Sequence, residues 1–261
     1  MFNKLSVEEF AVLKGPLESG RQSPQSLGGV LVLGAAMQAL AFYLIYSVAA
    51  ESSVYPNIEG IRNIHLWTTV ILSVLSIIYA IPYIYKRSEK TQYLLSIISS
   101  QNIGSACMYL GALFVIGADF DVTEESLIKL TFITLGFAIA LFILTFVRFY
   151  ILLHKGQYRE GSARGKIRER FETTSYIPMA IVLGMALVYI IQYLIRAGGL
   201  FSLETFFLTV LPLLVFYTMV FVLPEQLVIL YCKFRFKSFN FDRNGYLYSE
   251  SVTAKDKSLR V

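Results

Sequence analysis

The sequence predicts an all-α polytopic membrane protein, a bundle of six transmembrane helices with both termini in the cytoplasm. The first reason is composition: of 261 residues, 56% are hydrophobic and 16% are charged, whereas soluble chains average about 45–50% and about 25%. The second is a set of long apolar stretches, and the third is an uneven distribution of basic residues. This composition excludes a disulfide-rich secreted domain, a disordered chain and an ordinary cytosolic enzyme.

Six stretches are long enough to cross a bilayer. About 20 apolar residues span about 30 Å of hydrocarbon, and the stretches that meet this requirement are 27–50, 66–85, 93–118, 127–153, 176–195 and 203–232. They define a six-span transmembrane domain over 27–232, with a polar N-terminal arm at 1–26 and a basic, aromatic tail at 233–261. The arm lacks the basic-then-apolar order of a cleavable signal, so we expect the first span to be retained.

Basic residues predict the orientation. The arm, the connections 86–92 and 155–175, the tail and Arg148 together hold 20 of the 23 Lys and Arg residues. Because Lys and Arg in short connections stay in the cytoplasm, both termini are predicted inside. We expect the partner of this charge to be the anionic inner leaflet, and not nucleic acid. Two cysteines at different depths and the lack of any Asn-x-Ser/Thr sequence suit a bacterial cell membrane.

Three segments, 33–50, 103–120 and 183–200, align without gaps and share an aliphatic–Gly–x–Ala start at Gly34, Gly104 and Gly184. One interpretation is a triplicated two-span hairpin; the other is that any two membrane helices align because they use few residue types. In either case the small residues allow helix backbones to approach closely. We therefore expect these three helices to form the inner packing of the bundle.

Away from the outer ends of the predicted spans, two charged residues remain inside them, Glu225 in the sixth and Arg148 in the fourth. Both are about 20 residues from the outer end, hence at matched depth. They either form an interhelical ion pair or extend separately to the cytoplasmic interface. Pro212 and Pro224 lie in the sixth span, and proline removes an amide donor, so we expect this helix to be kinked or broken near Pro224.

The inner half of the third span is polar, with Ser99, Ser100, Gln101 and Asn102 in sequence. These groups either bond neighbouring helices or line a wet vestibule, and interhelical bonding is the commoner use. In the tail, residues 239–248 predict a short hairpin around Asn244-Gly245. Such a hairpin would need to dock on the cytoplasmic connections, because two strands alone are marginal.

No enzyme signature occurs. HExxH, GxSxG and P-loop sequences are absent. His65 is predicted at the outer boundary of its span and His154 at the inner boundary, so they cannot share a metal. We therefore expect no catalytic residue, no cofactor and no metal site, and the chain is predicted not to be an enzyme.

The chain resembles uncharacterised multi-span membrane proteins encoded beside type VII secretion toxins in Gram-positive bacteria. The resemblance lies in RFYILLHKGQYREGS, which leads into a charged connection, and LPEQLVILYCKFRFKSFNF, which leads into the tail. It implies a toxin-immunity or secretion-accessory factor that binds a membrane-active toxin or a secretion component, and it carries over no catalytic residues. The alternative is a small transporter or channel with a site at the sixth span around Glu225. An exposed small-residue face would also suit a homo-oligomer.

Overall fold

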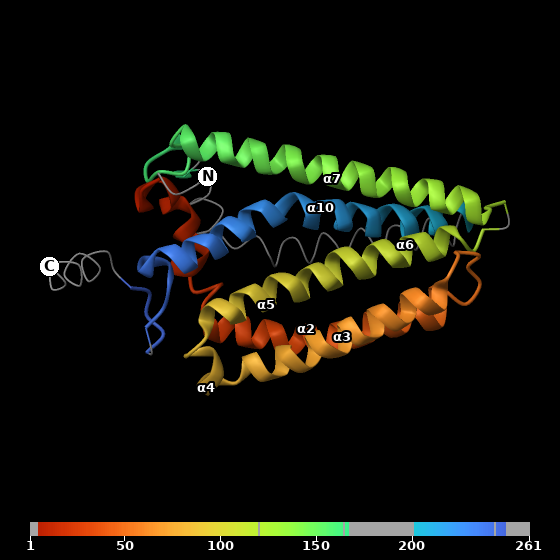
Figure 1. Cartoon of the computed structure of the whole chain (residues 1–261), viewed down its shortest axis with the longest axis horizontal. Helices are drawn as coiled ribbons and strands as arrows, with labels where there is room; N and C mark the ends of the chain where they lie inside the picture. The colour runs from red at the N-terminus through yellow and green to blue at the C-terminus, as the bar shows by residue number, and fades with distance from the viewer. Residues whose placement is uncertain (1–4, 120, 164, 167–200, 243, 249–261) are drawn as a thin grey trace, which may run out of the picture.

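The computed structural model describes residues 5–119, 121–163, 165–166, 201–242 and 244–248. In this part of the chain, long helices run side by side along the long axis of the molecule (Figure 1). No strand forms among these residues apart from one isolated antiparallel bridge between Phe241 and Leu247. The all-α prediction is therefore confirmed for the described residues. The predicted span 176–195, with Gly184, lies outside them.

Among the residues that the structure describes, four helices are long and apolar enough to cross a membrane. The first combines α2 (Pro24–Leu44) with the π-helical η2 (Ile45–Ala49). The others are α3 (Ile58–Ala80), α7 (Glu124–His154) and the Phe207–Arg235 part of α10 (Phe201–Arg235). They correspond to the first, second, fourth and sixth predicted spans, and they make the chain compatible with a membrane protein.

Proline affects the second and sixth spans differently. Helix α3 ends at Ala80 because Ile81 precedes Pro82 and is extended, with ψ of 125°; the short α4 (Pro82–Tyr85) follows. Helix α10 instead continues through Pro212 and Pro224 as one unbroken helix. The predicted break near Pro224 is therefore wrong, because neighbouring turns keep the helix continuous. A kink at either proline stays a prediction.

The third predicted span is a continuous helical run made of α5 (Glu89–Gln101), the π-helical η3 (Asn102–Cys107) and α6 (Met108–Ile116). It lies between the α2–α3 pair and α10 (Figure 1), and it contacts all three of those helices. Two of its polar residues, Ser99 and Asn102, are buried among these helices. This position explains why it can be less apolar than the four helices above.

One end of the bundle carries the starts of α2 and α5, the ends of α3, α7 and α10, and the short helices η1 (Val7–Lys14), α1 (Gly15–Glu18) and η4 (Lys237–Phe239) (Figure 1). We call it the basic end. Phe10, Leu13 and Leu17 of the arm are at most 1% exposed and pack against the ends of α5, α7 and α10. The arm is thus a folded cap on the bundle, held by apolar residues three and four positions apart.

Candidate functional site

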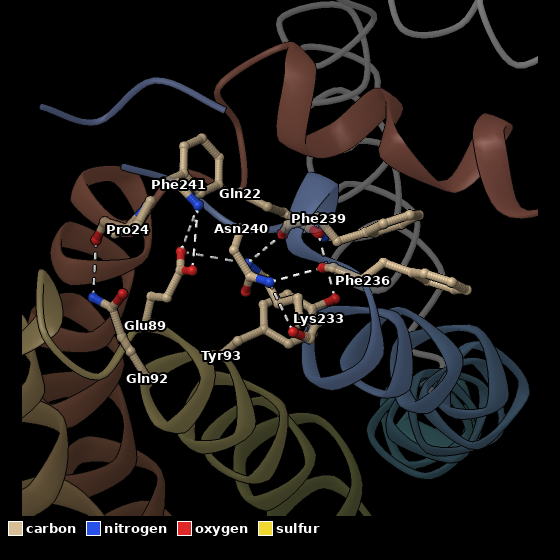
Figure 2. Close-up of polar contacts among 10 residues, drawn as sticks. All are labelled: Gln22, Pro24, Glu89, Gln92, Tyr93, Lys233, Phe236, Phe239, Asn240 and Phe241. Carbon is tan, nitrogen blue, oxygen red and sulfur yellow. Dashed lines mark hydrogen bonds and ion pairs between the residues drawn. The ribbon is translucent and has the colours of Figure 1, made fainter. Parts of the chain in front are cut away.

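Lys233 is the centre of a buried polar cluster at the basic end (Figure 2). Its side chain is 1% exposed in the last turns of α10. Nζ donates to the carbonyl oxygen of Phe239 at 3.0 Å and lies 3.7 Å from Oε2 of Glu89, in the first turn of α5. The rings of Tyr93 and Phe241 lie 5.5 and 5.3 Å from Nζ. A buried ammonium group is tolerated only with such partners.

The Glu89 carboxylate also holds the tail. It accepts from the backbone N–H of Phe241, with N–O distances of 3.0 and 3.2 Å to its two oxygens. Asn240 Nδ2 donates to the carbonyl oxygens of Lys233 and Phe236 at 2.8 and 2.9 Å, which satisfies backbone acceptors at the end of α10. Burial raises the pKa of the Glu89 carboxyl above its ordinary value of 4.5, while Lys233 and the Phe241 N–H oppose this shift.

The predicted hairpin around Asn244-Gly245 is present and docked. The backbone N–H of Asp242 donates to the carbonyl oxygen of Tyr246 at 2.7 Å, and Gly245 takes a φ of +90° at the turn. Its docking group is Glu89, through the Phe241 N–H. The hairpin therefore contacts the 86–92 connection, as expected; that its folding depends on this contact stays a prediction.

Gln92 and Tyr93 connect α5 to the rest of the basic end. Gln92 is fully buried, and its Nε2 donates to the carbonyl oxygens of Pro24 at 2.8 Å and Tyr79 at 3.1 Å. The Tyr93 hydroxyl donates to Oε1 of Gln22 at 3.4 Å (Figure 2). One turn of α5 therefore ties the start of α2, the end of α3 and the tail together.

Sequence reasoning missed this cluster, because it assigned Glu89 and Lys233 to separate cytoplasmic segments. A signal was available: Lys233 directly follows one predicted apolar stretch, Glu89 lies four residues before another, and both ends are on the same predicted side. A second ion pair at the basic end joins the arm to the residues that follow α7: Arg159 makes a bidentate contact with Glu9. The hydrogen bond from Arg159 holds the pKa of the Glu9 carboxyl below its ordinary value of 4.5.

Beside the Lys233 cluster lies a cleft of about 640 Å³ between the Lys86–Thr91 segment, the end of α10 and the tail. We call it the basic cleft. Its charged lining residues are six cations and one carboxylate: Lys86, Arg87, Lys90, Lys233, Arg235, Lys237 and Glu89. Aromatic side chains, among them Phe234, Phe236 and Tyr248, form the rest of its wall together with the polar residues Ser88, Thr91 and Asn240. This combination is suited to anions, not to metal cations.

The polar half of the third span bonds to neighbouring helices. The Ser99 hydroxyl lies 3.1 Å from that of Ser76 in α3, and Gln101 Nε2 donates to the carbonyl oxygen of Met219 in α10 at 3.2 Å. Ser100 instead donates to a carbonyl oxygen of its own helix. These contacts favour the interhelical interpretation of Ser99 and Gln101 over a wet vestibule.

A second polar group lies deeper. Asn102 Nδ2 donates to Oε1 of Gln38 at 3.0 Å. His65 is 6% exposed, and its Nδ1 and Nε2 lie 3.1 Å from the Tyr46 hydroxyl and 3.6 Å from the Cys107 sulfur. The position of His65 at the outer boundary of its span stays a prediction. The helix begins at Ile58, so this imidazole lies two turns inside α3 and faces the bundle.

Two of the three predicted packing glycines lie in described helices. At Gly104 a Cβ atom would be 2.8 Å from Cγ of Met219, so this glycine leaves room for a side chain of α10. At Gly34 a Cβ atom would be 3.8 Å from Cδ1 of Ile103, an ordinary contact. Of these two glycines, Gly104 is therefore the one whose missing side chain matters for packing.

Arg148, Pro224 and Glu225 line one cavity of about 240 Å³ between α7 and α10. Arg148 is exposed, Glu225 is half-buried and Pro224 is buried. The two charged residues that the sequence placed at matched depth are thus brought to the same cavity. Direct ion pairing between them stays a prediction.

Within the described residues, no group of three His, Cys, Asp or Glu side chains is arranged to hold a metal ion. Comparisons with protein-family models, with curated proteins and with solved structures find no match. Functional inference therefore depends on the geometry described above.

Proposed function

We propose that this chain is a non-catalytic integral membrane protein with six spans and cytoplasmic termini, which acts by binding another protein inside the bilayer. The surface of α7 is the observation that carries the proposal. In the most apolar 18-residue stretch of this helix, only 6% of the residues are buried. Large side chains project from it, with Phe132 72%, Ile133 70% and Phe137 59% exposed.

The polar interior supports the same proposal. Ser76 with Ser99, Gln101 with the Met219 carbonyl and Asn102 with Gln38 use their hydrogen-bonding groups between helices. An interior tied in this way is suited to a rigid scaffold, and its outer helix surface is then the part available to a partner. Association of membrane helices depends on close van der Waals packing, which aromatic and branched apolar side chains provide.

The partner that fits α7 is an apolar membrane-inserted helix of another protein. For a toxin-immunity factor, binding such a helix of a membrane-active toxin would block its insertion or oligomerisation. A secretion-accessory factor would use the same surface on a component of the secretion machinery. The resemblance to proteins encoded beside type VII toxins favours these two roles.

The test compares two doubly substituted variants in cells that express a candidate toxin. Phe132→Ala with Ile133→Ala removes bulk from α7, and Ile71→Ala with Val74→Ala removes similar bulk from the exposed face of α3, where these residues are 54% and 51% exposed. We expect the α7 variant to lose protection and photo-crosslinking to the toxin, and the α3 variant to retain both. Equal protection by both variants, or none by the wild type, would contradict the proposal.

The cavity between α7 and α10 favours one alternative, a small transporter or channel. It combines Arg148 and Glu225 with Pro224, and an acidic group beside a helix-interior proline is a feature of some ion sites. The test is a single cysteine at position 225, after Cys107→Ala and Cys232→Ala replace the buried native thiols. Labelling by a water-soluble maleimide would support this alternative, and complete protection would reject it.

A further inference from the structure

Cations outnumber carboxylates among the described residues that line the basic cleft. Glu89 is the one carboxylate among them, and it is already engaged by Lys233 and the Phe241 N–H. Arg87 and Lys90 lie on the same wall, and their charged groups lie over the rings of Tyr83 at 4.1 Å and Phe234 at 5.4 Å. An anion placed between these two cations would be attracted by both.

The start of helix α5 adds backbone hydrogen-bond donors that also favour an anion. Its first turn, Ser88–Thr91, lines the cleft. The Ser88 side chain does not cap this turn and instead donates to the carbonyl oxygen of Ile84 at 2.8 Å. Amides of a first turn have no acceptor within their helix, and together with the helix dipole they favour a bound anion.

Asn240 is an independent indication of a ligand. It lines the cleft and is 6% exposed, and its Oδ1 has no hydrogen-bond partner in the described part of the chain. A buried acceptor of this kind normally has a donor. The amide nitrogen of Asn240 is fully used by the Lys233 and Phe236 carbonyls, so a ligand hydroxyl would bond to this oxygen.

The position of the cleft selects a lipid over a soluble anion. It lies where the apolar part of α10 ends at Arg235 and just beyond the end of α3 at Ala80. Phe234, on its wall, is 60% exposed. Aromatic and basic side chains at the end of membrane helices lie at headgroup level, and basic pockets between such helices bind anionic headgroups.

We propose that the basic cleft binds an anionic phospholipid with a hydroxylated headgroup. The lipid phosphate lies among Arg87, Lys90 and the first turn of α5, and a headgroup hydroxyl donates to Oδ1 of Asn240. This site requires that the chain is a membrane protein, but it does not depend on any protein partner of α7.

The test measures binding of a fluorescent phosphatidylglycerol to the purified full chain in neutral detergent. Phosphatidylcholine with the same acyl chains and inorganic phosphate serve as competitors. We expect phosphatidylglycerol to bind, and neither competitor to displace it at matched concentration. Equal binding of phosphatidylcholine would overturn the proposal. Displacement by inorganic phosphate alone would assign the cleft to a soluble phosphate and would equally overturn it.

Matched variants test the location of the site. Arg87→Gln with Lys90→Gln should weaken phosphatidylglycerol binding by about 30-fold, from the contribution of two cations. Arg21→Gln with Lys155→Gln removes the same charge from the basic end outside the cleft and should change binding by less than about twofold. The charge-retaining exchange Arg87→Lys with Lys90→Arg should keep most of the affinity. Equal losses in the two neutralised variants would show a diffuse charge effect and refute the site.

Discussion

Glu89→Ala is expected to detach the tail from the bundle and destabilise the basic end. The substitution removes the ion-pair partner of Lys233, whose side chain is 1% exposed, and the acceptor of the Phe241 N–H. Loss of one partner of a buried pair costs about 3–5 kcal/mol, and an orphaned buried donor costs about 1–3 kcal/mol. Because Lys233 keeps its bond to the Phe239 carbonyl and Phe241 is only half-buried, we expect a total near the lower sum, about 4 kcal/mol.

Two further variants separate the contributions. Glu89→Gln keeps an acceptor for the Phe241 N–H and loses only a charge that burial disfavours, so it should cost much less than Glu89→Ala, at most about 1 kcal/mol. Adding Lys233→Met to Glu89→Gln removes the unpaired ammonium, and the double variant should regain most of that loss, because apolar replacement of a buried pair is often neutral.

The pH dependence gives an independent check on Glu89. Burial raises its pKa in the folded protein above the ordinary value of 4.5. Ionisation therefore costs more in the folded state than in the unfolded state, and stability falls as the pH rises from about the ordinary value through the folded pKa. Glu89→Gln should remove this decrease.

The assay is equilibrium unfolding of the purified chain in mixed micelles, with limited trypsin cleavage after the exposed Lys237 as a local readout of tail docking. Faster cleavage should accompany the loss in free energy of unfolding. If Glu89→Ala unfolds within about 0.5 kcal/mol of the wild type and its tail is cleaved at the wild-type rate, the assigned role of this cluster is incorrect.

Two other predictions concern the arm and the helix packing. Because Arg159 lowers the pKa of Glu9, the stabilising contact is present above pH 4.5 and is lost as the pH falls through the folded pKa. Thermal unfolding at pH 7 and pH 3.5 should therefore show a smaller acid-induced loss of stability in Glu9→Gln than in the wild type. Equal losses in the two proteins would exclude the contact. Gly104→Ala should destabilise the protein by about 1–3 kcal/mol, because the new Cβ atom would lie 2.8 Å from Cγ of Met219. Gly136→Ala in α7 is the matched control with open space at that position, and unfolding free energies should show it to be neutral or slightly stabilising.

The interior shows where sequence reasoning reached its limit. The sequence predicted an inner position for the third span from Gly104, but it did not show that the span contacts α2, α3 and α10. It placed His65 at a boundary, after the polar residues Glu59, Arg62 and Asn63, and did not show the buried contacts of this imidazole with Tyr46 and Cys107. The structure continues α3 through those polar residues, since a polar stretch can be helical where it extends beyond the apolar part of a span.

The sequence by itself determined that the described chain is all-α and where most of its long apolar helices lie along the chain. The physical reason is that an apolar segment long enough to cross a bilayer can satisfy its backbone hydrogen bonds there as a helix, without help from other segments. Only the tertiary structure decided which faces of these helices meet, and therefore that Glu89 pairs with Lys233, that Arg148 and Glu225 line one cavity, and that the basic residues enclose a cleft. Rotation of a helix about its axis changes every such contact but leaves its hydropathy unchanged, so these contacts depend on how the packed helices fit together.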